Sequence, residues 1–227
     1  MEIKGEKLEI AYGDYTAVRD MDIHVQKGMI TSIIGPNGSG KSTVLKGLTR
    51  LLGYKNGAVY VDRRNLKEFT SKELAQHIGV LPQIHSAPPD FQVKELVGYG
   101  RMPYQKWYQH NSDEDKQIID WAMKATGVWK QRDKSINQCS GGEMQRVWIA
   151  MVLTQQPEIL FLDEPTTYLD ISHQLEMMRL VKKLNRENGM TVVLITHHMD
   201  EAAQAEARRP PRGGRGLKFR LPSAPPK

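Results

Sequence analysis

The glycine-rich string Gly35-Pro36-Asn37-Gly38-Ser39-Gly40-Lys41-Ser42-Thr43 has the composition and spacing of a loop that holds phosphate groups. It fits the P-loop pattern G-x-x-x-x-G-K-[ST], in which glycines let backbone N–H groups converge on phosphate oxygens. Lys41 supplies a full positive charge for the outer phosphates, and the Ser42 hydroxyl suits Mg²⁺. A helix that starts here would add positive potential. The alternative interpretation is a chance glycine-rich turn.

Two carboxylates, Asp163 and Glu164, directly follow the apolar run Ile159-Leu160-Phe161-Leu162. Such a run predicts a strand buried on both faces, and open α/β sheets bind ligands beyond the carboxyl ends of their strands. Asp163 there suits a metal contact through water, and Glu164 suits the base that orients or deprotonates an attacking water. Alternatively, the two carboxylates only cap a following turn.

A third string, Cys139-Ser140-Gly141-Gly142-Glu143, opens a predicted helix and can therefore also bind an anion. The apolar positions that follow have the spacing i, i+3, i+4, i+7, i+8, which predicts a helix from Gly142 that Pro157 ends. The alternative is a glycine-rich helix start with no ligand. Cys139, the single cysteine, is interpreted as a small packed apolar residue rather than a reactive thiol.

Alternating strands and helices must position these strings, which predicts an α/β fold with a mainly parallel sheet. Residues 3–34 have the pattern of strands, and the last of these ends directly at Gly35. Capping patterns at Thr70 and Ser112 predict a helix start after each, whereas residues 84–111 lack clear periodicity. Further helices are predicted over 41 to about 52 and about 172 to 188, and further strands over 59–61, 159–162 and 191–195.

Length and composition bound the class of protein. The chain has 227 residues, enough for one large domain or two small ones. We expect no signal peptide and no membrane span, because no apolar run approaches the roughly 20 residues that a span needs. A single cysteine excludes an internal disulfide and fits a reducing compartment.

In the order and spacing of these strings, residues 1 to about 206 resemble the ATP-binding subunits of ABC transporters. The resemblance implies a P-loop NTPase (RecA-like) core, a small antiparallel β subdomain and an inserted helical subdomain over about 84–154. It also implies ATP and Mg²⁺ as cofactors and Mg-dependent ATP hydrolysis as the activity.

The resemblance implies further site residues. Tyr12 matches the aromatic residue that stacks on adenine, and Gln83 matches the glutamine that contacts the metal and water and senses the membrane partner. Asp170 matches the loop that crosses the dimer interface, and His197 matches the switch histidine near the γ-phosphate. The implied catalytic residues are Glu164, His197, Lys41 and Gln83, and the implied metal contacts are Ser42, Gln83 and Asp163.

Cys139–Glu143 matches the family signature, usually written L-S-G-G-Q, with two departures. Cys139 replaces Leu and Glu143 replaces Gln. Ser140, Gly141 and Gly142, which carry the anion contact, are intact. A contact of Glu143 with nucleotide is left open by the substitution.

The resemblance also implies partners. Two subunits would pair head to tail, with the Gly35–Thr43 loop of one facing Ser140–Gly142 of the other. Integral-membrane permease subunits would dock on a surface from Gln83 to about Tyr104, on the cytoplasmic face of a bacterial or archaeal membrane. A substrate-binding protein would act indirectly, and no nucleic acid is expected.

The strings Pro165–Gln174 and Gly100–Tyr104 resemble those of importers for iron(III)-siderophores, haem and cobalamin, with siderophore-bound iron the expected cargo. Two alternatives differ in class. One is a soluble ABC-type ATPase acting on nucleic acid or the ribosome, although such proteins usually carry duplicated cassettes or long coiled-coil insertions. The other is a nucleotide-binding remnant that cannot cycle.

The last residues, 207–227, break the pattern. They contain five Arg, two Lys and no acid, so they contribute +7 to the net charge of +6, and residues 1–206 sum to −1. Three interpretations are open for this basic Pro/Arg/Gly-rich tail: a frameshifted or truncated end, a disordered extension, or a segment that binds RNA or anionic lipid.

Overall fold

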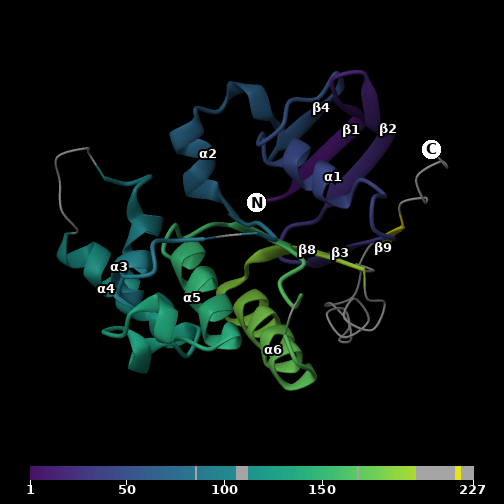
Figure 1. The fold of residues 1–227 in the computed structure, drawn as a ribbon. Coiled ribbons are helices and arrows are strands. Elements are labelled where there is room, and N and C mark those ends of the chain that lie inside the picture. Colours follow the sequence, from purple (N-terminus) through teal and green to yellow (C-terminus); the bar gives the residue numbers. More distant parts are fainter. Residues whose placement is uncertain (85, 106–111, 168, 198–217, 221–227) are drawn as a thin grey trace.

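Two β-sheets lie side by side in the computed structural model, which describes residues 1–84, 86–105, 112–167, 169–197 and 218–220 (Figure 1). The antiparallel sheet has the strand order β2-β1-β4-β5, with β1 Ile3–Tyr12, β2 Tyr15–Val25, β4 Asn56–Val61 and β5 Arg64–Asn65. The parallel sheet has the order β6-β7-β8-β3-β9, with β3 Ile30–Ile34, β6 Ile78–Leu81, β7 Ile159–Asp163, β8 Thr191–Thr196 and β9 Lys218–Arg220.

Helices connect the strands in the order that the sequence predicted for an α/β fold. The α-helices are α1 Lys41–Leu48, α2 Ser71–His77, α3 Val93–Gly98, α4 Asp113–Ala125, α5 Gly141–Leu153 and α6 Ile171–Asn188. Short 3-10 helices lie at η1 Leu66–Glu68, η2 Tyr99–Arg101, η3 Trp129–Gln131 and η4 Ile136–Gln138. We refer to α3–α5 with η2–η4 as the helical subdomain.

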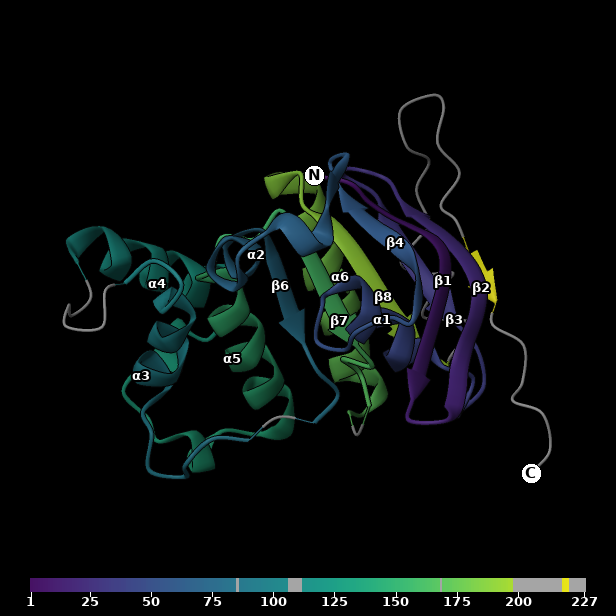
Figure 2. The ribbon, with the colours of Figure 1, turned by 90° about the horizontal axis from the view of Figure 1, so that it is seen from above.

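The parallel sheet separates two apolar cores. Successive residues of β7 point to opposite faces, so Ile159 and Phe161 pack with α1 and the antiparallel sheet, while Leu160 and Leu162 pack with α5 and α6. Every residue of β3, β7 and β8 is buried, as a strand covered on both faces requires. Figure 2 shows α1 between the two sheets and the helical subdomain on the far side of β6.

Local capping signals fixed several helix starts as predicted. Thr70 and Ser112 each form a reciprocal capping box with the residue three positions later, Glu73 and Asp115. At the C-terminal end of α6, Gly189 takes the left-handed conformation (φ 63°) that ends the helix.

Three expectations need correction. The first helix ends at Leu48 rather than near Leu52, because Arg50 takes a left-handed conformation (φ 60°) that no glycine signalled. The signature helix begins at Gly141, one residue before the predicted start. Helix α3 and η2 lie in the segment without clear periodicity, and they are too short for a helical repeat to show. The last helix begins at Ile171, which agrees with the predicted start near Ser172.

Strand β9 belongs to the tail, to which the sequence had assigned no element. It pairs in parallel with β3, with Ile33 opposite Phe219. The rest of residues 207–227 lies outside the described residues, so the three interpretations of the tail stay predictions.

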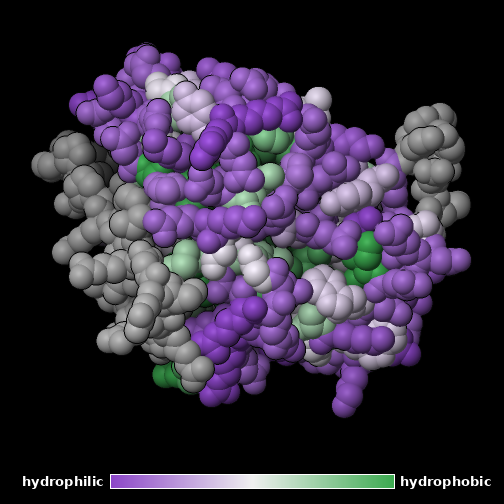
Figure 3. All heavy atoms as spheres, turned by 180° about the vertical axis from the view of Figure 1, so that it is seen from behind, coloured by the Kyte–Doolittle hydropathy of each residue, from purple (hydrophilic) through white to green (hydrophobic). Residues whose placement is uncertain are grey.

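The face of the molecule in Figure 3 is largely hydrophilic, with small separate hydrophobic spots. Within the ranges described above, every helix is too short or too polar to cross a membrane.

Candidate functional site

The carboxyl ends of four neighbouring parallel strands gather the predicted catalytic residues. Gln83 follows β6, Glu164 follows β7, His197 follows β8, and the loop starting at Gly35 follows β3. Because β6, β7, β8 and β3 are adjacent in this order, four segments far apart in sequence meet at one edge of the sheet.

The P-loop bends tightly before α1. Gly38 (φ 78°) and Gly40 (φ 91°) take conformations that favour glycine, and a Cβ on Gly40 would lie 3.0 Å from the backbone oxygen of Ala17. The buried Lys41 ammonium folds back and donates to the carbonyl oxygens of Gly35 (2.9 Å) and Pro36 (3.0 Å). Its charge therefore lies over the mouth of the loop.

The same loop carries a polar group that fits a phosphate. Among the described residues, Ser39 is one of a few with a buried side-chain oxygen that has no hydrogen-bond partner. A buried hydroxyl without a partner costs free energy, which a phosphate oxygen would recover. Pro36, Asn37 and Gly38 are exposed at the loop tip, so the loop is open to a ligand.

Ser42 and Asp163 form a ready pair of oxygen ligands. The Ser42 hydroxyl donates to Oδ1 of Asp163 at 3.1 Å, across 121 positions of sequence. Burial raises the pKa of the Asp163 carboxyl, an effect that the Ser42 hydrogen bond opposes and the neighbouring Glu164 charge reinforces. A hard cation beside this carboxylate would stabilise its charged form, so the donor set fits Mg²⁺.

Glu164 is held by three side chains. Its Oε2 accepts from Gln83 Nε2 (2.9 Å) and from the Thr167 hydroxyl (3.0 Å), and its Oε1 lies 3.4 Å from Nδ1 of His197. Its backbone is left-handed (φ 49°), a conformation unusual for a glutamate. The structure thus brings Gln83, Glu164 and His197 together, and it adds Thr167, which the sequence reasoning missed.

Tyr12 lies at the edge of the P-loop. Its hydroxyl accepts from the hydroxyl of Thr43 at 3.5 Å, and its side chain is 45% exposed at the end of β1. An exposed aromatic ring beside a phosphate cradle is available to stack on a base.

Ser140–Glu143 lies elsewhere, at the start of α5 in the helical subdomain. Ser140 caps the helix: its hydroxyl accepts from the Glu143 backbone N–H (3.3 Å), and its own N–H donates to Glu143 Oε2 (2.9 Å). The Ser140 N–H and the Gln131 side chain lower the pKa of Glu143. Glutamate and glutamine serve equally at this capping position, so Glu143 in place of Gln preserves the helix start.

The two signature glycines differ in their surroundings. A Cβ on Gly141 would meet only open space, whereas a Cβ on Gly142 would overlap the imidazole of His173 on α6. Cys139 packs against the core, and burial raises the pKa of its thiol, as expected for a packed rather than a reactive cysteine.

Asp170 adjoins this second region through His173. It caps α6, accepting from the His173 backbone N–H and ring Nδ1 (both 2.9 Å) and from the Ser172 hydroxyl (2.7 Å). These hydrogen bonds hold the pKa of Asp170 far below its ordinary value. The sequence did not single out His173, although its i+3 spacing from a capping aspartate was a usable signal.

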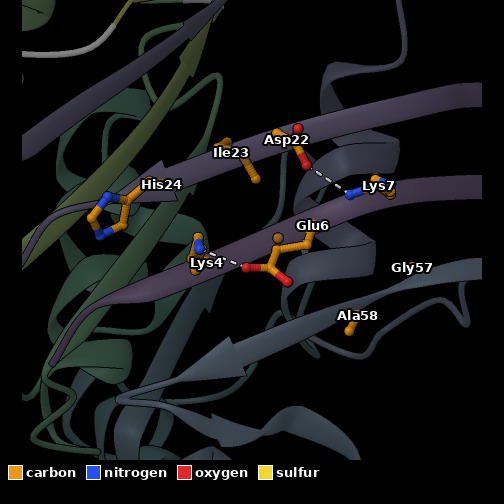
Figure 4. A pocket seen from close by; sticks show the side chains of 9 residues that line it. Lys4, Glu6, Lys7, Asp22, Ile23, His24, Gly57 and Ala58 are labelled. Carbon is orange, nitrogen blue, oxygen red and sulfur yellow. Dashed lines mark hydrogen bonds and ion pairs between the residues drawn. The ribbon is translucent and has the colours of Figure 1, made fainter.

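Two hollows lie away from these residues. One of about 650 Å³ lies on the antiparallel sheet, where Lys4 pairs with Glu6 and Asp22 accepts from the Lys7 backbone N–H (Figure 4). The other, of about 740 Å³, lies between α4, Met1 and the end of α6. Neither is lined by the predicted site residues.

Comparisons with known proteins show which family the chain resembles as a whole. Residues 18–167 match the family described as ABC transporter. The iron(3+)-hydroxamate import ATP-binding protein FhuC of Bacillus subtilis is 46% identical over 199 residues, covering 88% of this chain and 74% of that protein. The ferric enterobactin transport ATP-binding protein FepC of Escherichia coli is 43% identical over 202 residues, covering 89% and 74%. A bacterial ABC transporter cassette solved as a dimer has a TM-score of 0.77 at 30% identity, and the match covers 90% of this chain and 91% of that one.

Proposed function

The chain belongs to the ABC transporter family, as an ATP-binding and ATP-hydrolysing subunit, and on that premise we propose that it powers the import of iron(III)-siderophore complexes. The observation that carries the ATPase assignment is the convergence of Lys41, Asp163, Glu164 and His197 at one sheet edge. The cargo is proposed because the two relatives above are named for iron(3+)-hydroxamate and ferric enterobactin.

Nucleotide would bind with its base against Tyr12 and its phosphates in the Gly35–Thr43 loop. Lys41 would exchange the carbonyl oxygens of Gly35 and Pro36 for phosphate oxygens, keeping the same donor and position. The partnerless hydroxyl of Ser39 would gain an acceptor. Lys41 would exchange neutral acceptors for charged ones, and Ser39 would gain a charged acceptor where it has none. Both changes favour the nucleotide-bound state.

Ser42 and Asp163 would hold Mg²⁺, and Gln83, which contacts the neighbouring Glu164, would join them. The ion, when bound, neutralises phosphate charge. Glu164 would orient a water and accept its proton, while Gln83 and Thr167 fix the carboxylate. His197, on the other carboxylate oxygen, would report on the γ-phosphate.

A second copy would complete the site, with Ser140–Gly142 of one subunit facing the P-loop of the other. In one chain these segments belong to different parts of the fold: the P-loop to the β3–α1 connection, the signature to the start of α5 (Figure 1). Asp170, beside the signature through His173, would lie in the same interface.

The membrane partners would dock near Gln83 to Tyr104, on the cytoplasmic face of the membrane, and a substrate-binding protein would act through them. Tyr99 and Met102 are exposed there, at 47% and 63%. We assign residues 1–206 to the ATPase domain, with the helical insertion at about 84–154, and treat 207–227 as an atypical tail, of which Lys218–Arg220 adds the strand β9 beside β3.

Two measurements test the proposal. Purified protein should release phosphate from ATP in the presence of Mg²⁺, and the Glu164→Gln variant should not; equal rates would remove the catalytic assignment. A strain lacking the gene should lose uptake of iron(III)-hydroxamate and regain it with the wild-type gene but not the Glu164→Gln gene. Loss of haem or cobalamin uptake instead would reassign the cargo.

A further inference from the structure

A buried ion pair in the helical subdomain takes no part in the site described above. Arg101 in η2 and Asp115 in α4 are 4% and 7% exposed, and Arg101 Nε donates to Asp115 Oδ1 at 2.6 Å. Arginine and aspartate are rarely buried, because removing both charges from water is costly unless every polar atom is satisfied. Such a pair therefore calls for an explanation beyond packing.

The guanidinium has further partners at the C-terminal end of α5. Its Nη1 donates to the backbone oxygen of Thr154 (2.7 Å), the residue that caps α5, and to the side chain of Gln156 (3.1 Å). Its Cζ atom lies 3.9 Å from the centre of the Tyr104 ring. A cation at the carbonyl end of a helix is also favoured by the helix dipole.

The backbone around Arg101 is seated tightly on the same helix end. A Cβ on Gly100 would overlap the backbone oxygen of Met151. The Thr154 hydroxyl donates to Val97 at 3.0 Å, and the Tyr104 hydroxyl donates to the backbone oxygen of Gln155 at 2.7 Å. Burial favours the neutral form of Asp115, yet the hydrogen bonds from Arg101 and Ser112 outweigh it and lower its pKa, so the pair is charged.

Helix α5 thus connects two functional regions. Its start is Ser140–Gly142, and its end, about 20 Å away at 1.5 Å per residue, is held by Arg101. Next to Arg101 stand the exposed Tyr99 and Met102, in the region proposed for the membrane partner.

We propose that Arg101 is a positioning residue that locks the Tyr99–Met102 surface to the C-terminal end of α5, so that this surface follows the helix when nucleotide engages Ser140–Gly142 at its other end. The inference rests on the proposed function, because it needs nucleotide to contact the signature. A merely structural role for the pair would lower stability but would leave the two ends of α5 responding together.

Amide hydrogen exchange measured by mass spectrometry tests this, with the Glu164→Gln protein as parent and ATP with Mg²⁺ as the probe. Two variants are compared. Arg101→Lys keeps a charge beside Asp115 but lacks the planar fork that reaches both Asp115 and Thr154. The second variant, Arg101→Met with Asp115→Leu, removes both charges and so leaves no unpaired buried ion to unfold the chain.

The matched control is Arg132→Lys. Arg132 also belongs to the helical subdomain, stacks on an aromatic ring (Trp129, 4.7 Å) and pairs with an acid (Asp133, 3.3 Å), but these partners are in its own segment. Thermal unfolding of every variant shows whether a lost exchange response at residues 100–105 comes from lower stability of the fold or from loss of the coupling between the two ends of α5.

In the parent, nucleotide should slow exchange both at residues 140–146 and at residues 100–105. Both Arg101 variants should keep the slowed exchange at residues 140–146 and lose it at residues 100–105. The Arg132→Lys variant should keep the slowed exchange at both segments. The inference would be overturned if the Arg101 variants kept slowed exchange at both segments. It would also be overturned if nucleotide slowed exchange in the parent only at residues 140–146. If the parent shows no response at 140–146, the proposed nucleotide contact fails, and this inference fails with it.

Discussion

The carboxyl edge of the parallel sheet and the start of α5 differ in the polar groups that they leave for a ligand. At the sheet edge, each charged group already has a partner within the chain: Lys41 has backbone oxygens, Asp163 has Ser42, and Glu164 has three side chains. At the start of α5, Ser140 and Glu143 satisfy each other, and Gly141 faces open space.

This difference shows how the two regions would serve one reaction. The sheet edge is assembled in a single subunit, and nucleotide has only to replace its internal partners. The first N–H groups of a helix lack partners within it, and the capping box uses those of Ser140 and Glu143. Those of Gly141 and Gly142 would then be available to an anion, which in the proposed dimer is a phosphate held by the second subunit.

The largest expected effect is at Glu164. The Glu164→Gln variant should hydrolyse ATP about 10²–10⁴-fold more slowly, because the amide cannot accept a proton from water. Binding of ATP should persist, since the amide oxygen can still accept from Gln83 and Thr167. Phosphate release and nucleotide affinity are measured side by side; a variant that loses affinity as strongly as rate would show that Glu164 belongs to the binding apparatus.

The second effect is at Lys41. Removing its charge in Lys41→Ala should weaken ATP binding about 10- to 100-fold, the equivalent of roughly 1.5–3 kcal/mol for a hydrogen bond to a charged group. The titration uses ATP against each protein, with Lys46→Ala on the exposed side of α1 as control. If the two alanine variants bind equally well, the P-loop assignment is wrong.

Alanine substitutions at the two signature glycines, Gly141 and Gly142, should change the stability of the fold in opposite directions while both lower activity. Gly142→Ala should destabilise the isolated subunit by about 1–3 kcal/mol, because its methyl group overlaps His173. Gly141→Ala should raise stability by about 0.4–1 kcal/mol, because it restricts the unfolded chain and meets no neighbour.

Thermal unfolding gives the sign of each change, and the ATPase assay should show lower activity in both variants. The double variant Gly142→Ala/His173→Ala should recover part of the stability lost at Gly142. Equal stability of the two single alanine variants would contradict the contrast between a packed glycine and an open one.

The smallest effect is at Glu143. Glu143→Gln should change stability at neutral pH by no more than about 0.5 kcal/mol, since either residue completes the capping box. The folded pKa of Glu143 is lowered from 4.5, so the charged carboxylate stabilises the fold above that pH and loses its contribution as the pH falls through the lowered value. Wild type should therefore lose more stability than the variant on acidification; parallel pH profiles would refute this capping role.

Features encoded within a few neighbouring residues could be predicted from the sequence. The P-loop, the buried strand before Asp163 and the capping boxes at Thr70 and Ser112 all follow from local spacing. The roles of Gln83 and His197 came from family resemblance, and the structure adds that both side chains reach Glu164.

Features that depend on distant contacts could not be predicted. The overlap of Gly142 with His173 and the hydrogen bond from Arg101 to Thr154 join segments with no common pattern. Helix α3 is only six residues long, and α1 ends at Leu48, two residues before an arginine (Arg50) that takes a conformation usually left to glycine. In each case tertiary packing decides the outcome, and local propensity does not show it.

The claim that two copies share each site is tested most directly by mixing two inactive variants. Lys41→Ala disables the P-loop, and Gly141→Asp places a carboxylate where a phosphate should bind, at a position with room for it. In a head-to-tail dimer of one chain of each kind, one site combines the intact P-loop with the intact signature. If two copies share each site, each variant alone should hydrolyse no ATP and the mixture should hydrolyse it; a mixture as inactive as its components would show that the sites are not shared.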